Sequence, residues 1–396
     1  LGPSFLSGGL RSWSKMEGNK MKSRVLVLGA GFGGLELATL LSDELGAEAD
    51  VTVIDKGESF VFGFSKLEVA FGKKTLEDVS HPYRDFDKPG VRLMRDTVTD
   101  IDPEARMVTT ESGSYTYTAD YLVVALGADV MPSATPGLAE IGTHFYSADG
   151  AERICAALPE FKKGHAIIGI CGFPYKCPPA PTECALMLDN YLRQRGLREA
   201  CEITLVSPRS ILTPVSQELS EDVMHACAEA GVLVYLKTLV TSVEEGVATL
   251  DNGEQLPFDL FLGVPKHAAP KVVRDSDLTE SDWISIDLAS METAFPDVYA
   301  MGDAAKTGLP KAGSFAESQA SAVASGILSK IRGGEAAPNT GSGECQVEFG
   351  DGRVSWADAD FLSGPKLTVV YNPPSLEGRK HKEAFAKDRE VRWFGE

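Results

Sequence analysis

Short apolar runs alternate along this chain with segments in which apolar residues recur at helical spacing. Residues 25–28 are all Val or Leu, residues 35–45 carry apolar side chains on one helical face, and residues 51–54 form a second, mainly apolar run. Uninterrupted apolar runs are typical of buried parallel strands, which are joined by crossover helices. The beginning of the chain therefore predicts a βαβ unit.

The same pattern returns further along the chain. Strands are predicted at 91–100, 105–118, 120–128, 165–170, 202–206, 232–236, 247–250, 259–263 and 298–304, and helices at 147–161, 182–195, 217–230 and 314–331. After a Gly/Pro/Ala/Ser linker at 333–342, two strand-like pieces (347–349 and 367–371) precede a short polar helix. This order predicts an α/β fold of two nested Rossmann-like dinucleotide-binding domains with a small C-terminal cap.

The expected domain boundaries follow from these units. Residues 23–135 and 271–335 form the two parts of a first dinucleotide-binding domain, and residues 136–270 form the second Rossmann-like domain. Residues 336–396 form the cap. Residues 1–22 are rich in Gly and Ser and lack the apolar core of a secretory signal, so we expect a disordered leader there.

Three glycines, Gly29, Gly31 and Gly34, follow the first apolar run at G-x-G-x-x-G spacing. Gly29 permits a tight turn, Gly31 lets a pyrophosphate approach the backbone, and Gly34 lets the helix pack on the strand. The helix N-terminus offers free N–H groups to the phosphates. Asp55, at the end of the second run, can accept hydrogen bonds from a ribose. We therefore predict a dinucleotide site here; the alternative is a tight turn that binds nothing.

Composition limits the partners and the compartment. The net charge of −19 disfavours a nucleic-acid partner. The charge is compatible with a small basic electron carrier as partner, although ordinary solubility explains it better. No apolar run approaches 18 residues, so no transmembrane helix is expected. The seven cysteines form no C-x-x-C pair, so no metal site is expected, and a cytoplasmic enzyme with reduced thiols fits best.

The second βαβ unit lacks the glycine motif of the first. Its strand is followed by a loop that contains four prolines, Pro174, Pro178, Pro179 and Pro181. Proline inside a helix costs about 3 kcal/mol, so we expect this loop to replace the first helical turn that would hold a nicotinamide dinucleotide. The strand at 202–206 also ends without a ribose-binding acid. Use of NAD(P)H is therefore disfavoured.

The same loop carries Cys177, and Glu183 follows six residues later. A thiolate is the nucleophile in disulfide exchange. The neighbouring Lys176 and the adjacent helix N-terminus are both expected to lower the pKa of the Cys177 thiol. The alternatives are that Cys177 is a buried spectator and that Glu183 is a first-turn residue favoured by the helix dipole.

Over about residues 24–332 the chain resembles the flavoproteins with two dinucleotide-binding domains. Within them it is similar to the sulfide:quinone oxidoreductase and flavocytochrome c sulfide dehydrogenase branch. The resemblance implies FAD in the first site. It also implies cofactor contacts along the glycine turn, after the second strand and at four later places. These contacts are at Phe32, Gly33, Lys56, Val98, Ala125, Gly127, Gly302, Asp303 and Lys311. Lys311 would stabilise negative charge on the reduced ring, or is simply a solvated loop lysine.

The stretch 174–183 resembles the segment that carries a redox-active cysteine beside the flavin in sulfide dehydrogenases. The resemblance implies that Cys177 is this cysteine, that Glu183 transfers protons, and that Cys345 in the cap is the second redox cysteine. As a hypothesis, Cys177 and Cys345 form a disulfide or polysulfide bridge over one flavin face. A sulfide or small thiol attacks the bridge, and the released Cys177 thiolate passes two electrons to the flavin, which an external acceptor reoxidises.

Three departures from this branch bear on the cofactor and the acceptor. Gly63 stands where cytochrome-coupled relatives tether FAD through a cysteine, so non-covalent FAD is expected. Residues 128–130 lack the further cysteine of many quinone-coupled relatives. The tail 383–396 is too charged to dock on a membrane. The external acceptor (cytochrome, quinone or other) therefore stays open, as does the oligomeric state, with a homodimer as one option.

Three functions are compatible with these sequence features. The leading hypothesis is an FAD-dependent sulfide or thiol dehydrogenase. The first alternative is an NAD(P)H-dependent disulfide or quinone reductase. The second alternative is a non-catalytic, redox-sensing flavoprotein, which binds FAD without turnover.

Overall fold

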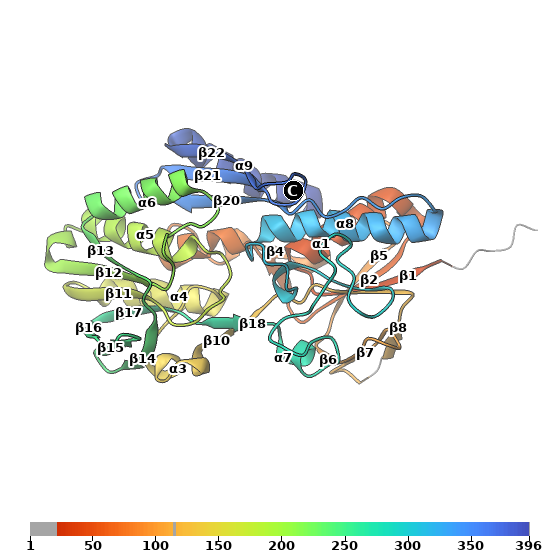
Figure 1. The fold of residues 1–396 in the computed structure, drawn as a ribbon, viewed down its shortest axis with the longest axis horizontal. Coiled ribbons are helices and arrows are strands. Elements are labelled where there is room, and N and C mark those ends of the chain that lie inside the picture. The colour runs from red at the N-terminus through yellow and green to blue at the C-terminus, as the bar shows by residue number, and fades with distance from the viewer. Residues whose placement is uncertain (1–21, 114–115, 396) are drawn as a thin grey trace, which may run out of the picture.

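Two parallel sheets flanked by helices form the frame of the molecule in the computed structural model, which describes residues 22–113 and 116–395 (Figure 1). The first sheet has five strands in the order β19-β9-β1-β2-β5, and the second has four in the order β13-β12-β11-β17. This architecture confirms the predicted fold class. The leader predicted at 1–22 lies, apart from Lys22, outside the described residues.

Four strands of the first sheet are buried on both faces, which explains their uninterrupted apolar runs, whereas the edge strand β5 is partly exposed. The strands of this sheet are β1 (Arg24–Leu28), β2 (Asp50–Asp55), β5 (Val91–Arg95), β9 (Tyr121–Val124) and β19 (Val298–Ala300). The helices α1 (Phe32–Leu45) and α8 (Gly313–Arg332) pack against each other on one face (Figure 1). All neighbouring strands are parallel, so their carboxyl ends meet at one edge.

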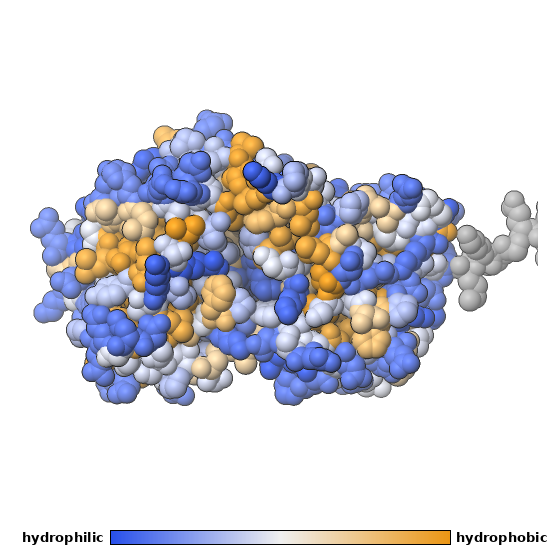
Figure 2. All heavy atoms as spheres, viewed as in Figure 1, coloured by the Kyte–Doolittle hydropathy of each residue, from blue (hydrophilic) through white to orange (hydrophobic). Residues whose placement is uncertain are grey.

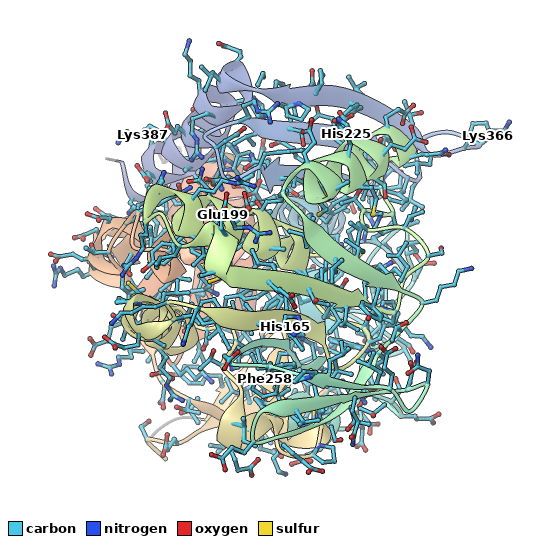
Figure 3. All side chains as sticks on the ribbon, turned by 90° about the vertical axis from the view of Figure 1, so that its left-hand side faces the viewer. His165, Glu199, His225, Phe258, Lys366 and Lys387 are labelled. Carbon is cyan, nitrogen blue, oxygen red and sulfur yellow. The ribbon has the colours of Figure 1, made fainter. Side chains whose placement is uncertain are left out.

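The second sheet repeats this arrangement. It consists of β11 (Gly164–Ile170), β12 (Cys201–Ser207), β13 (Val232–Leu236) and β17 (Leu260–Val264), with α4 (Ala148–Ala157), α5 (Ala180–Gln194) and α6 (Gln217–Glu229) beside it. In the end-on view of this domain, Glu199 lies in the turn that follows α5 (Figure 3). The chain passes between the two sheets through an antiparallel pair, β10 (Asp129–Met131) and β18 (Lys266–Ala268).

Smaller elements complete the two domains. They are β3 (Ser59–Val61) with β4 (Ser80–Pro82), β6 (Val98–Asp102) with β7 (Met107–Thr110) and β8 (Thr116–Thr118), β14 (Val240–Glu244) with β15 (Val247–Leu250) and β16 (Gln255–Pro257), and the short helices α2 (Lys66–Ala70), α3 (Leu138–Ile141) and α7 (Lys271–Arg274).

The C-terminal cap is larger than the sequence predicts. It contains three antiparallel strands, β20 (Ser342–Glu348), β21 (Val354–Asp360) and β22 (Thr368–Ser375), and a helix α9 of 19 residues (Leu376–Phe394). Strand β21 was not predicted, and α9 is not the short helix expected, because Phe385, Trp393 and Phe394 bury an apolar face that its charges conceal in the sequence. Apolar residues gather near the junction of α8 with the cap, whereas polar residues cover most of the visible surface (Figure 2).

The start of α5 corrects one prediction. Pro181 was expected to lie in a loop, but α5 begins at Ala180 and includes Pro181 in its first turn. The N–H groups of a first helical turn have no partner within the helix, so proline is tolerated there. In the described part of the chain, no helix is long and apolar enough to cross a membrane.

Candidate active site

A cavity of about 400 Å³ lies at the carboxyl ends of the first sheet and extends to the second domain and the cap. Most of the predicted site residues are on its wall: Gly29, Gly31, Phe32, Gly33, Asp55, Ala125, Cys177, Glu183, Gly127, Gly302, Asp303 and Lys311. Residues from the turns after β1, β2, β9 and β19 therefore meet at this edge. This is where open α/β sheets bind their ligands.

The glycine turn has the shape that a pyrophosphate needs. A Cβ added at Gly34 would lie 1.9 Å from the carbonyl oxygen of Gly29, so α1 can pack on β1 only with glycine there. A Cβ added at Gly31 would meet no atom within 4 Å, so the backbone there is open toward the cavity. The first turn of α1 holds no acidic residue and its N-cap makes no side-chain hydrogen bond. These features fit the diphosphate of FAD.

Asp55 holds this turn in place. Its Oδ2 accepts a hydrogen bond from the N–H of Ala30 at 2.8 Å, and its Oδ1 accepts one from the N–H of Gly57 at 2.7 Å. The hydroxyl of Tyr83 donates to the carbonyl of Ala30 at 2.9 Å. Each carboxylate oxygen keeps a second acceptor position. Asp55 can therefore brace the turn and accept a hydrogen bond from a ribose at the same time.

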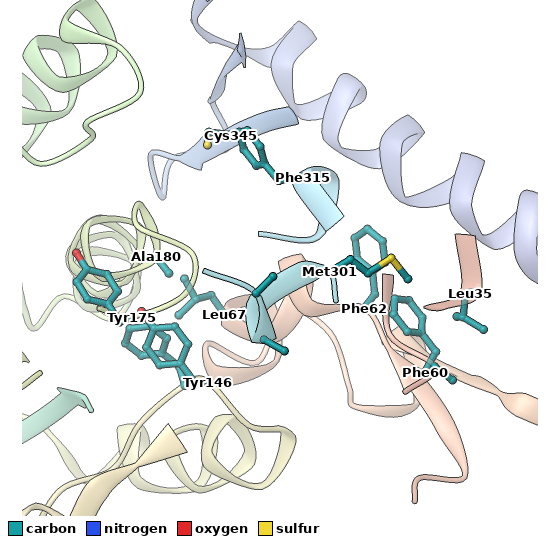
Figure 4. Packing of buried hydrophobic residues seen from close by; sticks show 14 of the residues in the cluster. Leu35, Phe60, Phe62, Leu67, Tyr146, Tyr175, Ala180, Met301, Phe315 and Cys345 are labelled. Carbon is teal, nitrogen blue, oxygen red and sulfur yellow. The ribbon is translucent and has the colours of Figure 1, made fainter. Parts of the chain in front are cut away.

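Four predicted site residues are not on the cavity wall. Gly34 lies behind the turn, where it contacts the backbone of Gly29. Lys56 is exposed, and Val98 is buried in β6. Cys345 lies in the cap near Phe315 (Figure 4). The remaining predicted residues converge as the sequence suggests.

Cys177 is held in an uncommon backbone conformation. Its φ is +53°, a region that non-glycine residues rarely adopt. Its N–H donates to the carbonyl of Lys311 at 2.7 Å, and its carbonyl accepts from the N–H of Ala180 at 3.0 Å. These bonds fix the loop before α5 against the loop after β19. Outliers of this kind cluster at functional sites.

The protonation of Cys177 differs from the prediction. Burial raises the pKa of its thiol well above the usual value, and the nearby charges of Glu183 and Cys345 raise it further. The expected lowering of this pKa by Lys176 is wrong, because the desolvation of the thiol outweighs all opposing effects. The ammonium of Lys176 instead donates to the carbonyl of Ala128 at 3.4 Å.

Glu183 lies in the first turn of α5 on the cavity wall. Burial raises the pKa of its carboxyl to about 7, although the charge of Lys382 and a hydrogen bond from the N–H of Glu348 act in the opposite direction. A carboxyl that titrates near neutral pH can both accept and donate a proton under working conditions. The position and pKa of Glu183 therefore suit proton transfer.

Cys345 lies on β20 and is 3% exposed. Burial raises the pKa of its thiol to about 12. All seven cysteines are in the described residues, and all are free thiols, so Cys177 and Cys345 are not joined by a direct disulfide here. Cys345 contributes to the raised pKa of the Cys177 thiol.

Lys311 is fixed by two carbonyl groups. Its ammonium donates to the carbonyls of Asp303 at 2.7 Å and Ala305 at 2.9 Å, and it lies 3.8 Å from the ring centroid of Trp283. Burial lowers the pKa of Lys311 to about 8. This lysine is not the solvated loop residue of the alternative interpretation, since it stands on the cavity wall.

A buried cluster of charges was missed by sequence analysis. Glu348 is fully buried, and its carboxylate contacts the cations of Lys73 at 2.7 Å, Lys382 at 3.1 Å and Arg379. Lys382 is also on the cavity wall. The nearest of these partners is 31 residues from Glu348, so no local motif marks the cluster. The sequence offers one signal, the charged residue Glu348 between the apolar residues Val347 and Phe349.

Comparison with known proteins finds one matching family and similarity to several sulfide:quinone oxidoreductases. Residues 23–321 match the family described as pyridine nucleotide-disulphide oxidoreductase. The mitochondrial sulfide:quinone oxidoreductase of Mus musculus is 27% identical over 370 residues, which cover 88% of this chain and 80% of that protein. The sulfide-quinone reductase of Aquifex aeolicus is 26% identical over 379 residues, which cover 88% and 86%.

The fold agrees with this similarity. The X-ray structure of the sulfide:quinone oxidoreductase from Aquifex aeolicus superposes with a TM-score of 0.83 at 25% identity, covering 93% of this chain and 91% of that one. The resemblance that the sequence predicts is therefore confirmed.

Proposed function

Because the chain belongs to the pyridine nucleotide-disulphide oxidoreductase family and is similar to sulfide:quinone oxidoreductases, we propose that it binds FAD, oxidises sulfide and passes two electrons to a quinone. The observation that carries this proposal is the position of Cys177 and Glu183. Both residues stand on the wall of the cavity that the glycine turn lines. In the sequence they follow the first strand of the second domain, the position at which a nicotinamide-using relative would carry its second glycine motif. Bound FAD would supply the two-electron acceptor.

The residues of this chain have distinct tasks in the proposal. The turn after β1 holds the diphosphate, and Asp55 the ribose. In the oxidised protein, Cys177 and the cap residue Cys345 are proposed to be joined by a disulfide or polysulfide bridge. Sulfide attacks this bridge, so that one S–S bond forms as another breaks, and the released Cys177 thiolate passes two electrons on to the flavin. Glu183 accepts the proton that sulfide releases when it is oxidised. The cap and the proline loop exclude water from the cavity.

We propose that FAD is bound without a covalent link. Gly63 is on the cavity wall and has no side chain that could form one. Denaturation of the holoprotein in acid should release all of its flavin into the supernatant. Flavin that stays with the precipitated protein would contradict non-covalent binding.

The choice of quinone rests on the names of the relatives. The polar tail argues against deep membrane insertion, since α9 turns Phe385, Trp393 and Phe394 inward. A quinone would therefore reach the protein from the bilayer surface or from water. A water-soluble short-chain quinone and a basic cytochrome c should be offered separately to the sulfide-reduced protein. If cytochrome c reoxidises the reduced flavin faster than the quinone does, the physiological acceptor is a protein and not a quinone.

The donor is tested by anaerobic titration of the oxidised holoprotein. Sulfide should bleach the flavin absorbance near ~450 nm with a stoichiometry of one sulfide per flavin, whereas NADH should not. Bleaching by NADH alone would support the NAD(P)H-dependent reductase. The absence of multiple turnovers with any sulfur donor and acceptor would support the redox-sensing flavoprotein. Cys177→Ser should lose the reduction by sulfide and keep the bound FAD, and Cys227→Ser serves as its control.

A further inference from the structure

The cavity wall beside Cys177 carries positive charge that no carboxylate contacts. Lys66 and Lys176 both stand on this wall. Lys66 donates to the carbonyl of Tyr146 at 3.1 Å, and Lys176 to the carbonyl of Ala128 at 3.4 Å. Within the described residues, neither ammonium has an ion pair within 4.0 Å. Carbonyl groups orient these lysines, but they do not neutralise them.

Lys382 differs in this respect, because it pairs with the carboxylate of Glu348 at 3.1 Å. Lys311 has no ion pair among the described residues either, but its ammonium is occupied by two carbonyls and the ring of Trp283. Burial and the charge of Lys176 together lower the pKa of Lys66 to about 7, against the weaker influence of Asp303 and Cys177. Lys66 is therefore only about half protonated near pH 7, and a bound anion would favour its charged form.

A third group on the same wall lacks a partner. Tyr146 is 5% exposed, lines the cavity, and its hydroxyl makes no hydrogen bond within the described structure. Its ring is fixed by Phe145 at 4.8 Å and His267 at 4.7 Å between centroids. Tyr146 and Tyr175 lie together beside Ala180, at the start of α5 (Figure 4). A buried hydroxyl without a partner is costly, so its position indicates a ligand that accepts a hydrogen bond.

We propose that Lys66, Lys176 and Tyr146 form an anion pocket next to Cys177 that holds the sulfur substrate as its anion, hydrosulfide, in preference to a neutral thiol. The inference deepens the proposed function and rests on it for the identity of the anion. Two ammonium groups and one hydroxyl donor favour a small anion. An uncharged thiol would leave these two half-buried ammonium groups without a counter-charge.

The test uses nitrate as an unreactive probe on the oxidised holoprotein, at constant ionic strength. Nitrate should perturb the flavin absorbance saturably. Lys66→Met and Tyr146→Phe should each weaken its binding about 10-fold, since hydrogen bonds to charged groups have this magnitude. Lys162→Met, which changes an exposed lysine, should leave it unchanged. Tyr146→Phe removes a single oxygen atom, so it remains informative if Lys66→Met does not fold.

Two controls distinguish a loss of nitrate binding in the pocket from a loss of bound FAD. The FAD dissociation constant of each variant, measured by flavin fluorescence, should be unchanged. An equal loss of FAD affinity in Lys66→Met would assign this lysine to the cofactor diphosphate and overturn the pocket. Unchanged nitrate binding in both variants would overturn it as well. Nitrate binding that depends on these residues in a protein that sulfide does not reduce would keep the pocket and reject the proposed function.

Discussion

The carboxylate of Glu183 accepts a hydrogen bond from the backbone N–H of Glu348, with 2.9 Å between Oε1 and N. This bond joins the first turn of α5 to the cap strand β20 across a sequence distance of 165 residues. The cap thereby brings Gln346 and Lys382 to the cavity wall. The C-terminal segment is therefore part of the cavity wall, and its contacts with Glu183 oppose the rise that burial causes in the pKa of this carboxyl.

Replacing Glu183 with Gln should change how the reaction depends on pH. The pKa of Glu183 is about 7, so its proton-accepting form predominates above pH 7. We expect the ratio of wild-type to Glu183→Gln flavin reduction rates to rise as pH increases through 7 and to reach about 100. Taking the ratio cancels the ionisation of sulfide itself. Stopped-flow reduction from pH 5.5 to 8.5 measures it, with the exposed Glu199→Gln as a control.

If the ratio of wild-type to Glu183→Gln reduction rates does not change with pH in this range, Glu183 does not transfer the proton. The same result with a reduced FAD affinity would indicate that the carboxyl only positions the cap.

Replacing Glu348 with Gln should destabilise the protein. The change leaves Lys73, Arg379 and Lys382 without their shared counter-charge, which should lower the free energy of unfolding by about 3 kcal/mol. Asp351→Asn removes a half-exposed ion pair with Arg353 and should lower it by less than about 1 kcal/mol. Urea denaturation at pH 7 measures both. If both substitutions lower the free energy of unfolding equally, the buried cluster around Glu348 does not stabilise the fold more than a half-exposed ion pair does.

Acid should destabilise the wild type through the same residue. The three cations hold the pKa of folded Glu348 below its ordinary value of 4.5, although burial opposes them. The stabilisation is therefore present above pH 4.5 and is lost as pH falls toward the folded pKa. Glu348→Gln should show a shallower loss of stability below pH 4.5. Parallel curves for the two proteins between pH 5 and pH 3 would contradict the assignment.

Two alanine substitutions in the glycine turn should separate folding from cofactor binding. Gly34→Ala places a Cβ 1.9 Å from the Gly29 carbonyl oxygen, so it should lower stability and FAD content together. Gly31→Ala meets no protein atom within 4 Å, and its φ of −82° suits alanine. It should keep the melting temperature of the apoprotein and weaken FAD binding at least about 10-fold, because the methyl group displaces the diphosphate. Retained FAD affinity in Gly31→Ala would argue against this cradle.

The second redox cysteine can be tested by substitution. If Cys345 pairs with Cys177 during turnover, Cys345→Ser should slow turnover with sulfide strongly while Cys227→Ser, a buried thiol in α6, has little effect. Mass spectrometry of the sulfide-treated wild type should find Cys177 and Cys345 linked, directly or through sulfur atoms. A link from Cys177 to Cys184 instead would assign the pair differently.

Much of this site follows from local sequence patterns. The apolar runs, the spacing of Gly29, Gly31 and Gly34, and the proline loop around Cys177 each involve neighbouring residues, and their geometry is set by short-range sterics. The errors also have local causes. Pro181 was excluded from α5 because its position within the first turn could not be read from composition, and α9 was underestimated because its three aromatic residues are spread among charges.

The sequence by itself determined the two βαβ frames, the dinucleotide turn and the thiol between them. Only the tertiary structure decided which charges share the cavity with that thiol. Lys66, Tyr146, Lys382 and Glu348 come from distant segments, and no spacing rule connects them. Burial also raised the pKa of Cys177 where its neighbour Lys176 predicted a lower one. Desolvation depends on all the atoms packed around a group, so it cannot be inferred from the residues beside it in the chain.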